Sequence, residues 1–296
     1  MDQKTIDIYK HVGIIAKEIR EFAKEFIKEG VLLIDIAKKI HQKIHALGAE
    51  PAFPVNLSID DVAAHYHPLH DDKTTAKGLL KVDIGVHIDG IIADTSISID
   101  LTKNKQHTAL IKATENALTE ALALLKKNPT LHDIGECIQR TITKEGFSPV
   151  INLSGHSIEK FQIHAGITIP NYGNGNMHTL APGVYAIEPF ATTGVGKIYE
   201  GQPGNIYAII QQKNIRSSTA RAILAYAHEK HKNLPFSYNE IEEKFGKRAR
   251  LALAELTRAS ILHSYSQLIE KSHHPVAQAE HTFIKTKDNA IIITTI

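Results

Sequence analysis

The sequence predicts an α+β protein with two helix-and-strand halves and a helical insertion towards its end. Apolar residues recur at three- and four-residue steps over residues 5–29 and 35–47, which is the period of amphipathic helices. Residues 81–100 alternate between apolar and polar, and further strand-like segments follow residue 150, which indicates two β-rich regions. Because helices followed by strands occur twice, we expect a pseudo-duplicated architecture, although the two halves share no recognisable sequence identity.

The composition is that of an ordinary globular protein, and the net charge does not indicate a strongly charged partner. Hydrophobic residues make up 43% of the 296 residues, and the net charge of +2 gives no electrostatic case for nucleic acid or a membrane as the main partner. The single cysteine, Cys137, excludes an internal disulfide framework and suits a reducing compartment. We expect a cytoplasmic location, since no segment approaches the ~20 apolar residues of a membrane helix and the first residues resemble no targeting peptide.

The first two predicted helices lead into a loop that carries aromatic and imidazole side chains. Gly30 is expected to end the first helix, and Asp35 is expected to be the N-cap of the second. The loop residues of interest are Phe53, His65, His67 and His70. The spacing of the histidines fits no standard metal site, and we interpret most of them as surface residues.

The hairpin at residues 81–100 carries the first candidate functional side chains, Asp83 and Asp94. Residues 89–90 are Asp-Gly, a strong turn signal, because glycine tolerates the positive φ that such turns require. With these two residues in the turn, Gly85 pairs with Asp94, and alternation places both aspartates on one face. Two carboxylates on one face repel each other unless a positive group lies between them. The hairpin therefore indicates a divalent metal site, with two solvated aspartates as the alternative.

The segment after the hairpin predicts two more amphipathic helices. The first covers residues 109–126, and a capping box at residues 130–133 opens the second. Cys137 shares the apolar face of that second helix, which indicates a core residue rather than a nucleophile.

The later strands contain carboxylates at positions where a charge is normally unwelcome. Strands are expected at residues 150–157, 163–166, 183–189, 276–284 and 290–293. Glu188 and Glu280 fall within two of them, although strands disfavour charged residues. The chain has no G-x-S-x-G elbow, so nothing indicates a serine hydrolase.

Residues 205–265 are rich in helix formers and predict a helical insertion of three short helices, at residues 221–230, 238–245 and 249–260. Their charges are of both signs, which favours a structural module over a DNA-binding one. The insertion divides a main domain into residues 1–204 and 266–296.

Four carboxylates and one imidazole from separated strands form a candidate metal centre. These residues are Asp83, Asp94, His156, Glu188 and Glu280. Oxygen and imidazole ligands without thiolates suit two divalent ions of the Mn, Fe, Co or Zn type. Two such ions ~3.5–4 Å apart lower the pKa of a shared water, and a nearby imidazole can donate to the developing oxyanion.

The segments around these residues resemble type 2 methionine aminopeptidase. The motifs that carry the resemblance are Asp83 and Asp94 eleven residues apart, Gly155-His156-Ser157-Ile158, Ile163-His164-Ala165-Gly166, Ala186-Ile187-Glu188-Pro189 and Ala279-Glu280-His281-Thr282, with Pro51–Ser58 and Ala63–Tyr66 upstream. The resemblance covers essentially the whole chain, and the insertion between Glu188 and Glu280 distinguishes type 2 from type 1. The chain lacks the long charged N-terminal extension of eukaryotic members, so it is similar to the archaeal form.

The resemblance implies the pita-bread fold, a pseudo-twofold domain whose curved antiparallel sheet holds two divalent ions and is flanked by helices. Asp94 and Glu280 would bridge the two ions. Asp83 would complete the shell of one ion, and His156 with Glu188 would complete the shell of the other. The ions would be Co, Mn, Fe or Zn, and a hydroxide that bridges them would be the nucleophile.

The resemblance also implies roles around the metals. Glu188 would move the proton of the bridging water. His164 would contact the scissile carbonyl or amide, and His65 would guide the substrate near the leaving peptide. Three residues would line the methionine pocket: Phe53, Ile163 and Tyr265.

The function that the resemblance implies is removal of the initiator methionine from nascent proteins with a small second residue. The substrate would be the N-terminal methionine of a nascent polypeptide, with the ribosome as a further candidate partner. No membrane or nucleic acid would be required, and a monomer is expected. One alternative is a prolidase or aminopeptidase P, against which the insertion and the Gly-His-Ser-Ile motif argue. The other is a noncatalytic pita-bread protein that binds ribosomes or RNA, against which the complete ligand set argues.

Overall fold

A nine-stranded antiparallel sheet forms the centre of the structure, a computed structural model that describes all 296 residues. The main path of the sheet is β1 (Glu50–Pro51), β4 (Leu79–Ile88), β5 (Ile91–Asp100), β15 (Glu280–Lys285), β9 (Gly183–Ile187), β7 (Ser154–Ile158) and β8 (Thr168–Pro170). Two further strands join its sides: β2 (Asn56–Ile59) pairs with β4, and β16 (Ile291–Ile293) pairs with β15. The two halves of the chain meet where β5 pairs with β15.

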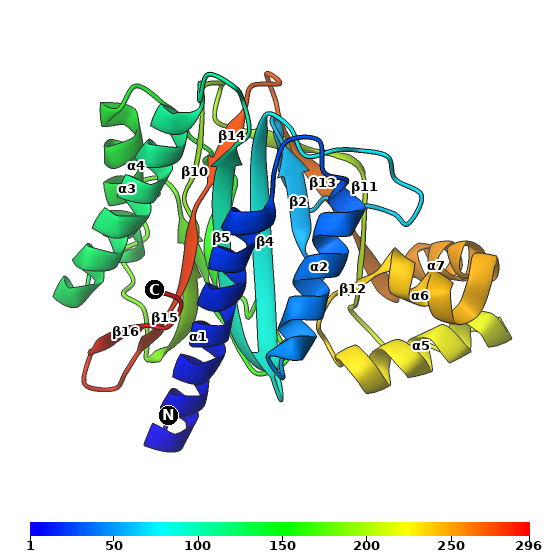
Figure 1. Cartoon of the computed structure of the whole chain (residues 1–296). Coiled ribbons are helices and arrows are strands. Elements are labelled where there is room, and N and C mark those ends of the chain that lie inside the picture. The colour runs from blue at the N-terminus through cyan, green and yellow to red at the C-terminus, as the bar shows by residue number, and fades with distance from the viewer.

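Two helix pairs cover one face of this sheet (Figure 1). α1 (Gln3–Phe26) and α2 (Leu33–Ala46) form one core with β4 and β5. α3 (Thr108–Leu124) and α4 (Leu131–Lys144) form a second core with β9 and β15. The β4 side chains in the first core are every second residue: Leu80, Val82, Ile84 and Val86. Asp83 therefore points away from the helices, to the other face of the sheet.

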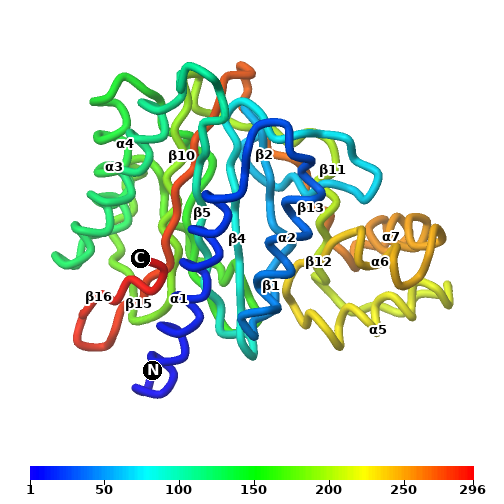
Figure 2. The backbone as a smooth tube through the Cα atoms, in the orientation of Figure 1, coloured from blue at the N-terminus to red at the C-terminus, as the bar shows by residue number.

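Two smaller sheets complete the molecule. One contains β14 (Val276–Gln278), β10 (Phe190–Thr192) and β6 (Ser148–Pro149); the other contains β12 (Phe236–Ser237), β11 (Ile198–Ile209), β13 (Leu262–Glu270) and β3 (Val62–Ala64). The tube in Figure 2 shows that β11 and β13 lead out to the insertion at one side of the molecule, far from α3 and α4.

The three helices of the insertion are present and share a core of their own. They are α5 (Ser218–His231), α6 (Tyr238–Phe245) and α7 (Ala249–Arg258), each close to its predicted range. Residues 205 and 265 lie inside the paired strands β11 and β13, so the insertion is continuous with a sheet that also includes β3. The division into domains at these residues stays a prediction.

Two predicted strands are each split in two, which moves the position of Glu188. Residues 183–189 form β9 and then turn at Glu188-Pro189 into β10, and residues 276–284 are divided into β14 and β15 at Ala279. The break is shared, because the Ala279 N–H donates to the Pro189 carbonyl at 3.2 Å while the flanking strands pair in different sheets. Glu188 thus lies between strands and Glu280 begins one, contrary to the mid-strand prediction.

Other local predictions differ from the structure for identifiable reasons. Residues 163–166 are a loop and not a strand; this loop folds back on β7, where the Ala165 N–H donates to the Ser157 carbonyl at 2.8 Å. Asp35 lies in the first turn of α2 and not at its N-cap, because the N–H of Leu33 is satisfied by the Thr74 carbonyl instead. The capping box at residues 130–133 and the burial of Cys137 are confirmed.

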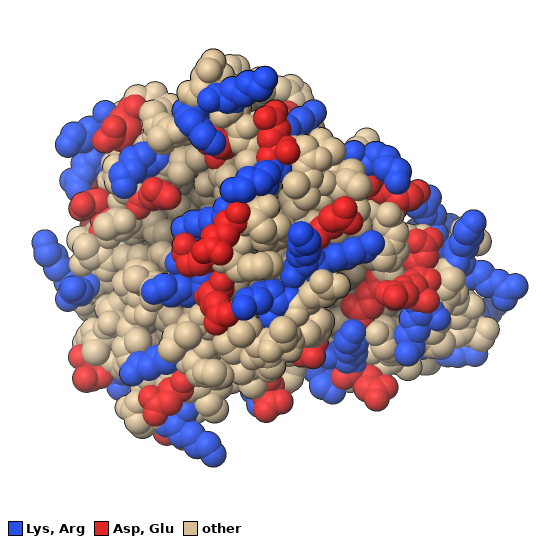
Figure 3. Space-filling model, in the orientation of Figure 1, with Lys and Arg blue, Asp and Glu red and all other residues tan.

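The surface in Figure 3 carries lysine and arginine side chains interspersed with acidic ones. None of the helices has the length and apolar character needed to cross a membrane.

Candidate metal centre and active site

The β4–β5 hairpin has the register that its sequence predicts. Ile88 pairs with Ile91 and Gly85 pairs with Asp94, which places Asp83 and Asp94 on the same face. Strand β15 then brings Glu280 beside them, because Glu280 pairs with Ser96 on β5.

His156 and Glu188 reach the same point from β7 and from the turn after β9. His156 Nε2 lies 3.6 Å from Asp94 Oδ2 and 4.0 Å from Glu280 Oε1. Donor atoms lie within 4.8 Å of one another in two groups, Asp94–His156–Glu280 and Asp83–Glu188–Glu280. The structure thus brings all five predicted ligands together and places Glu280 in both groups. The division of these ligands between two ions stays a prediction.

The carboxylates of this cluster are buried without enough hydrogen-bond donors. Asp83 Oδ1, Asp94 Oδ1 and both carboxylate oxygens of Glu280 have no partner. Burial raises the pKa of Asp83 to about 7, and burial with the neighbouring carboxylates raises the pKa of Asp94 and Glu280 well above the usual range. Buried charges are stable only when they are paired or bind a metal. The unpartnered oxygens and the imidazole therefore fit divalent ions of the Mn, Fe, Co or Zn type.

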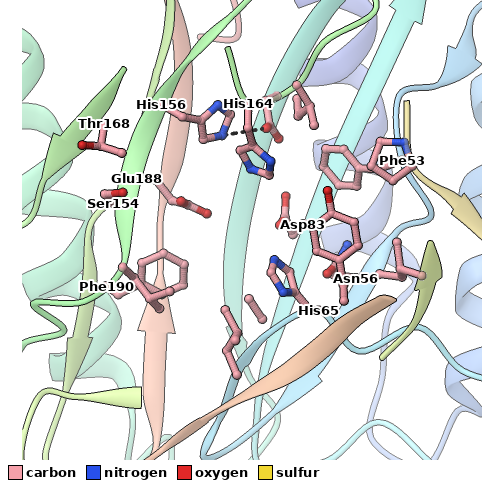
Figure 4. Close-up of a pocket in the computed structure, with 18 of the residues that line it drawn as sticks. Phe53, Asn56, His65, Asp83, Ser154, His156, His164, Thr168, Glu188 and Phe190 are labelled. Carbon is pink, nitrogen blue, oxygen red and sulfur yellow. Dashed lines mark ion pairs between the residues drawn. The ribbon is translucent and has the colours of Figure 1, made fainter. Parts of the chain in front are cut away.

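A cavity of about 360 Å³ opens onto the cluster. In Figure 4, Asp83 and Glu188 point into it, with His164 near His156 and with Phe53 on the opposite side. The residues that were predicted to contact substrate all line it: Phe53, His65, Ile163, His164 and Tyr265. The structure therefore supplies an apolar pocket directly beside the carboxylates.

Burial acts on two of the three histidines that line the cavity, His65 and His164. Burial lowers the pKa of His65 to about 4 and also lowers the pKa of His164. His65 has a left-handed φ of 66°, which is uncommon outside glycine. Its carbonyl oxygen lies close to Gly204, because a Cβ on Gly204 would be only 1.9 Å from that oxygen. Its ring packs edge-on against Tyr265, with ring centroids 5.1 Å apart. The backbone thus holds this imidazole at the cavity wall.

Phe53 is positioned by a glycine of the metal hairpin. A Cβ on Gly85 would lie 2.2 Å from Phe53 Cε1, far inside any normal contact. The phenylalanine ring therefore lies directly on the β4 backbone, between the two aspartate positions.

Comparison with known proteins assigns the family. The family description "Metallopeptidase family M24" matches residues 7–223. A methionine aminopeptidase of Pyrococcus abyssi is 42% identical over 294 residues, which cover 98% of this chain and 99% of the relative. The chain belongs to the methionine aminopeptidases of family M24. It is thus a hydrolase of the metallo-aminopeptidase class, as the motifs indicated.

Solved structures confirm the pita-bread fold of this M24 metallopeptidase. A thermophilic Arx1 superposes with a TM-score of 0.86 at 17% identity, covering 99% of this chain and 91% of that one. A methionine aminopeptidase from Rickettsia prowazekii superposes with a TM-score of 0.70 at 22% identity, covering 100% of this chain and 98% of that one. At these identities the likeness concerns the fold alone.

Two residues that contact the candidate ligands were not identified from the sequence, Gln278 and Thr282. Gln278 Nε2 donates to Glu188 Oε1 at 2.8 Å, and Thr282 Oγ1 both accepts from the Asp94 N–H and donates to its carbonyl at 2.8 Å. Alternation was the available signal, because Gln278 and Thr282 share a face with Glu280.

Arg20 is a further residue beside the site that the sequence analysis did not find. It lies on α1, yet its Nη1 donates at 2.9 Å to Thr95 Oγ1 and to the Thr295 carbonyl behind the cluster. Thr95 Oγ1 in turn donates to the Glu280 carbonyl at 2.9 Å. Arg20 lies four residues after Ala16 and three before Ala23, so the helical period places it on the buried face of α1, but the period does not reveal its partners.

Proposed function

We propose that this M24 aminopeptidase removes the initiator methionine from nascent proteins by means of two divalent ions. The observation that carries the proposal is the combination of buried, unpartnered carboxylates with an apolar cavity that His65 and His164 line. Asp83, Asp94, His156, Glu188 and Glu280 would hold the ions. When bound, these ions would lower the pKa of a shared water and stabilise the charge that develops during hydrolysis.

The chain's own residues then have separate tasks. Glu188 accepts a proton from the attacking water, and Gln278 keeps the Glu188 carboxylate oriented through the 2.8 Å hydrogen bond. His164 donates an N–H to the scissile carbonyl oxygen, where negative charge develops. His65 donates to the peptide beyond the scissile bond.

Substrate choice follows from the shape of the cavity. Phe53, Ile163 and Tyr265 contact the methionine side chain, whose unbranched thioether packs well against aromatic rings. We expect a small second residue to be preferred, because the residue beyond the scissile bond must also fit at the cavity of about 360 Å³.

The deciding experiment is a cleavage assay on the metal-reconstituted protein. Purified chain with Mn, Fe or Co is given Met-Ala-Ser and, separately, an X-Pro peptide. We expect methionine release from the first peptide and little cleavage of the second. Preferential X-Pro cleavage would instead establish a prolidase, and no cleavage with any metal would support a noncatalytic protein. The Glu280→Ala variant should lose both metal and turnover, and retained turnover would contradict the ligand assignment.

A further inference from the structure

The active-site cavity has a buried end and an exposed end. Phe53 and Ile163 line it and are buried, whereas residues 166–168 line it and are exposed. In Figure 4, Phe53 and Thr168 lie on opposite sides of Glu188. Under the proposed function the methionine side chain occupies the buried end. The rest of the polypeptide must therefore leave the cavity beside residues 166–168.

This exit is bordered by a free edge of the large sheet. Strand β8 is the last strand on the path of that sheet, and it pairs only with β7. An edge strand presents main-chain N–H and C=O groups to which another chain can add as a further strand. The polypeptide that leaves the cavity passes this edge, so it is the chain in a position to add to it.

The register of β7 and β8 shows which main-chain groups are free. The Ser157 N–H donates to the Ile167 carbonyl at 2.9 Å, which makes these two residues a hydrogen-bonded pair. Thr168 is opposite His156, at the next position, and hydrogen-bonded pairs alternate with non-hydrogen-bonded pairs in an antiparallel ladder. The N–H and the C=O of Thr168 therefore point away from β7, out of the edge of the sheet.

The same pairing fixes the distance between this edge and the candidate metal centre. His156, directly opposite Thr168, has its Nε2 3.6 Å from Asp94 Oδ2. Neighbouring strands lie about 4.8 Å apart, so a strand added to β8 runs roughly 10 Å from β7. About three residues of extended chain cover that distance. A polypeptide held for cleavage beside His156 therefore reaches the edge with its third or fourth residue.

The short edge restricts what can bind to it. β8 ends at Pro170, which has no N–H to donate, and Ile169 directs its main-chain groups towards β7. Thr168 is thus the one residue of this strand that offers both groups outward. Recognition through the main chain does not depend on side chains. This suits an enzyme whose substrates share a first methionine and differ in the residues that follow.

We propose that the polypeptide beyond the scissile bond binds as an added strand at β8, with its third or fourth residue paired to the main chain of Thr168. The inference rests on the proposed function, because it assigns a binding site to that substrate. Two main-chain hydrogen bonds raise kcat/KM by about tenfold once the peptide is long enough to make them.

Peptide length and a proline substitution test the pairing together. Metal-reconstituted full-length protein is given Met-Ala and, separately, Met-Ala-Ser-Ala-Gly. We expect the wild type to show about tenfold higher kcat/KM for the longer peptide. Thr168→Pro removes the outward N–H, and proline is tolerated as the first residue of an edge strand, so this length advantage should disappear. Thr168→Val is the matched control, because it keeps the N–H and the branched shape and should keep the advantage.

A second arm changes the peptide and leaves the protein as it is. Single N-methyl groups are placed in turn on the third, fourth and fifth residues of the longer peptide. Adjacent residues of a strand direct their main-chain groups to opposite sides. Methylation should therefore remove the length advantage at one position and leave it at the neighbouring one. This arm decides the matter if circular dichroism shows that Thr168→Pro does not fold.

Three results would overturn the pairing and leave the aminopeptidase function intact. One is equal kcat/KM for the short and the long peptide in the wild type. Another is the same length advantage in Thr168→Pro and Thr168→Val. The third is a methylation scan in which no position differs from its neighbour. Absence of methionine release from every peptide would instead contradict the proposed function and, with it, the pairing.

Discussion

Gly85 shows how a single absent side chain shapes the substrate pocket. The Phe53 ring occupies the space that a Cβ on Gly85 would need, because such a Cβ would lie 2.2 Å from Phe53 Cε1. The same glycine pairs with Asp94, so the pocket wall and the metal centre share one stretch of backbone. Under the proposed function, substrate contact and ligand position would therefore be coupled at Gly85.

We predict that Gly85→Ala raises KM for Met-Ala-Ser more than it lowers kcat, because the displaced Phe53 ring narrows the methionine pocket. Overpacking of this kind typically costs about 1–3 kcal/mol of stability. Steady-state kinetics and thermal unfolding measure both effects. Phe53→Ala added to Gly85→Ala should relieve the unfolding penalty, since it removes the clashing ring. Additive penalties in this double-mutant cycle would show that the two residues do not interact.

Glu240 illustrates how the elements of the insertion are held together. It lies on α6, and its Oε1 accepts hydrogen bonds from α5 side chains: Tyr226 at 2.6 Å, Lys230 at 2.7 Å and His231 at 2.9 Å. Burial alone would raise the pKa of Glu240, but the hydrogen bonds and charges of His231 and Lys230 outweigh it and lower the pKa to about 2. One carboxylate thus joins two helices.

This pKa predicts a pH-dependent contribution to stability. The folded-state pKa of Glu240 lies below its ordinary value of 4.5, so its contribution is complete above about pH 4.5 and is lost as the pH falls towards 2. The contribution is on the order of 3 kcal/mol. Chemical unfolding of the wild type and of Glu240→Gln across this range should show a difference that is largest near neutral pH and shrinks in acid. A difference that stays constant with pH would mean that the carboxylate charge is not the source.

At the scale of the element, the β4–β5 hairpin was the most predictable part of the chain. Its turn and its register follow from the Asp-Gly pair and the apolar alternation, both of which are local. The breaks after Ile187 and Gln278 were not predictable, because each depends on a partner strand distant in sequence. The orientation of Gln278 was missed for the same reason, and the interpretation of His67 as a surface residue is wrong, because its side chain is buried. The partners of Arg20 could not be predicted either, because one of them, Thr295, is 275 residues away in the sequence.

The candidate metal centre joins strands from distant parts of the chain. The stability of the whole protein should therefore depend on bound metal. We predict that chelation lowers the melting temperature by about 5 °C, because ions bound only by the folded state stabilise it by mass action. Thermal unfolding with and without Mn measures this, because Mn prefers oxygen ligands such as those of the carboxylate cluster. Glu280→Ala should show little Mn-dependent shift. An equal shift in that variant would place the stabilising ion elsewhere.

The pairing of β5 with β15 sets an order of events during synthesis. Asp83 and Asp94 leave the ribosome long before Glu280, and until β15 arrives the hairpin lacks the carboxylate that belongs to both ligand groups. Thr295, which Arg20 holds against β5, arrives later still. We therefore expect the complete ligand set to form only after β15 has been translated, and a polypeptide that stalls within the insertion to leave Asp83 and Asp94 without it.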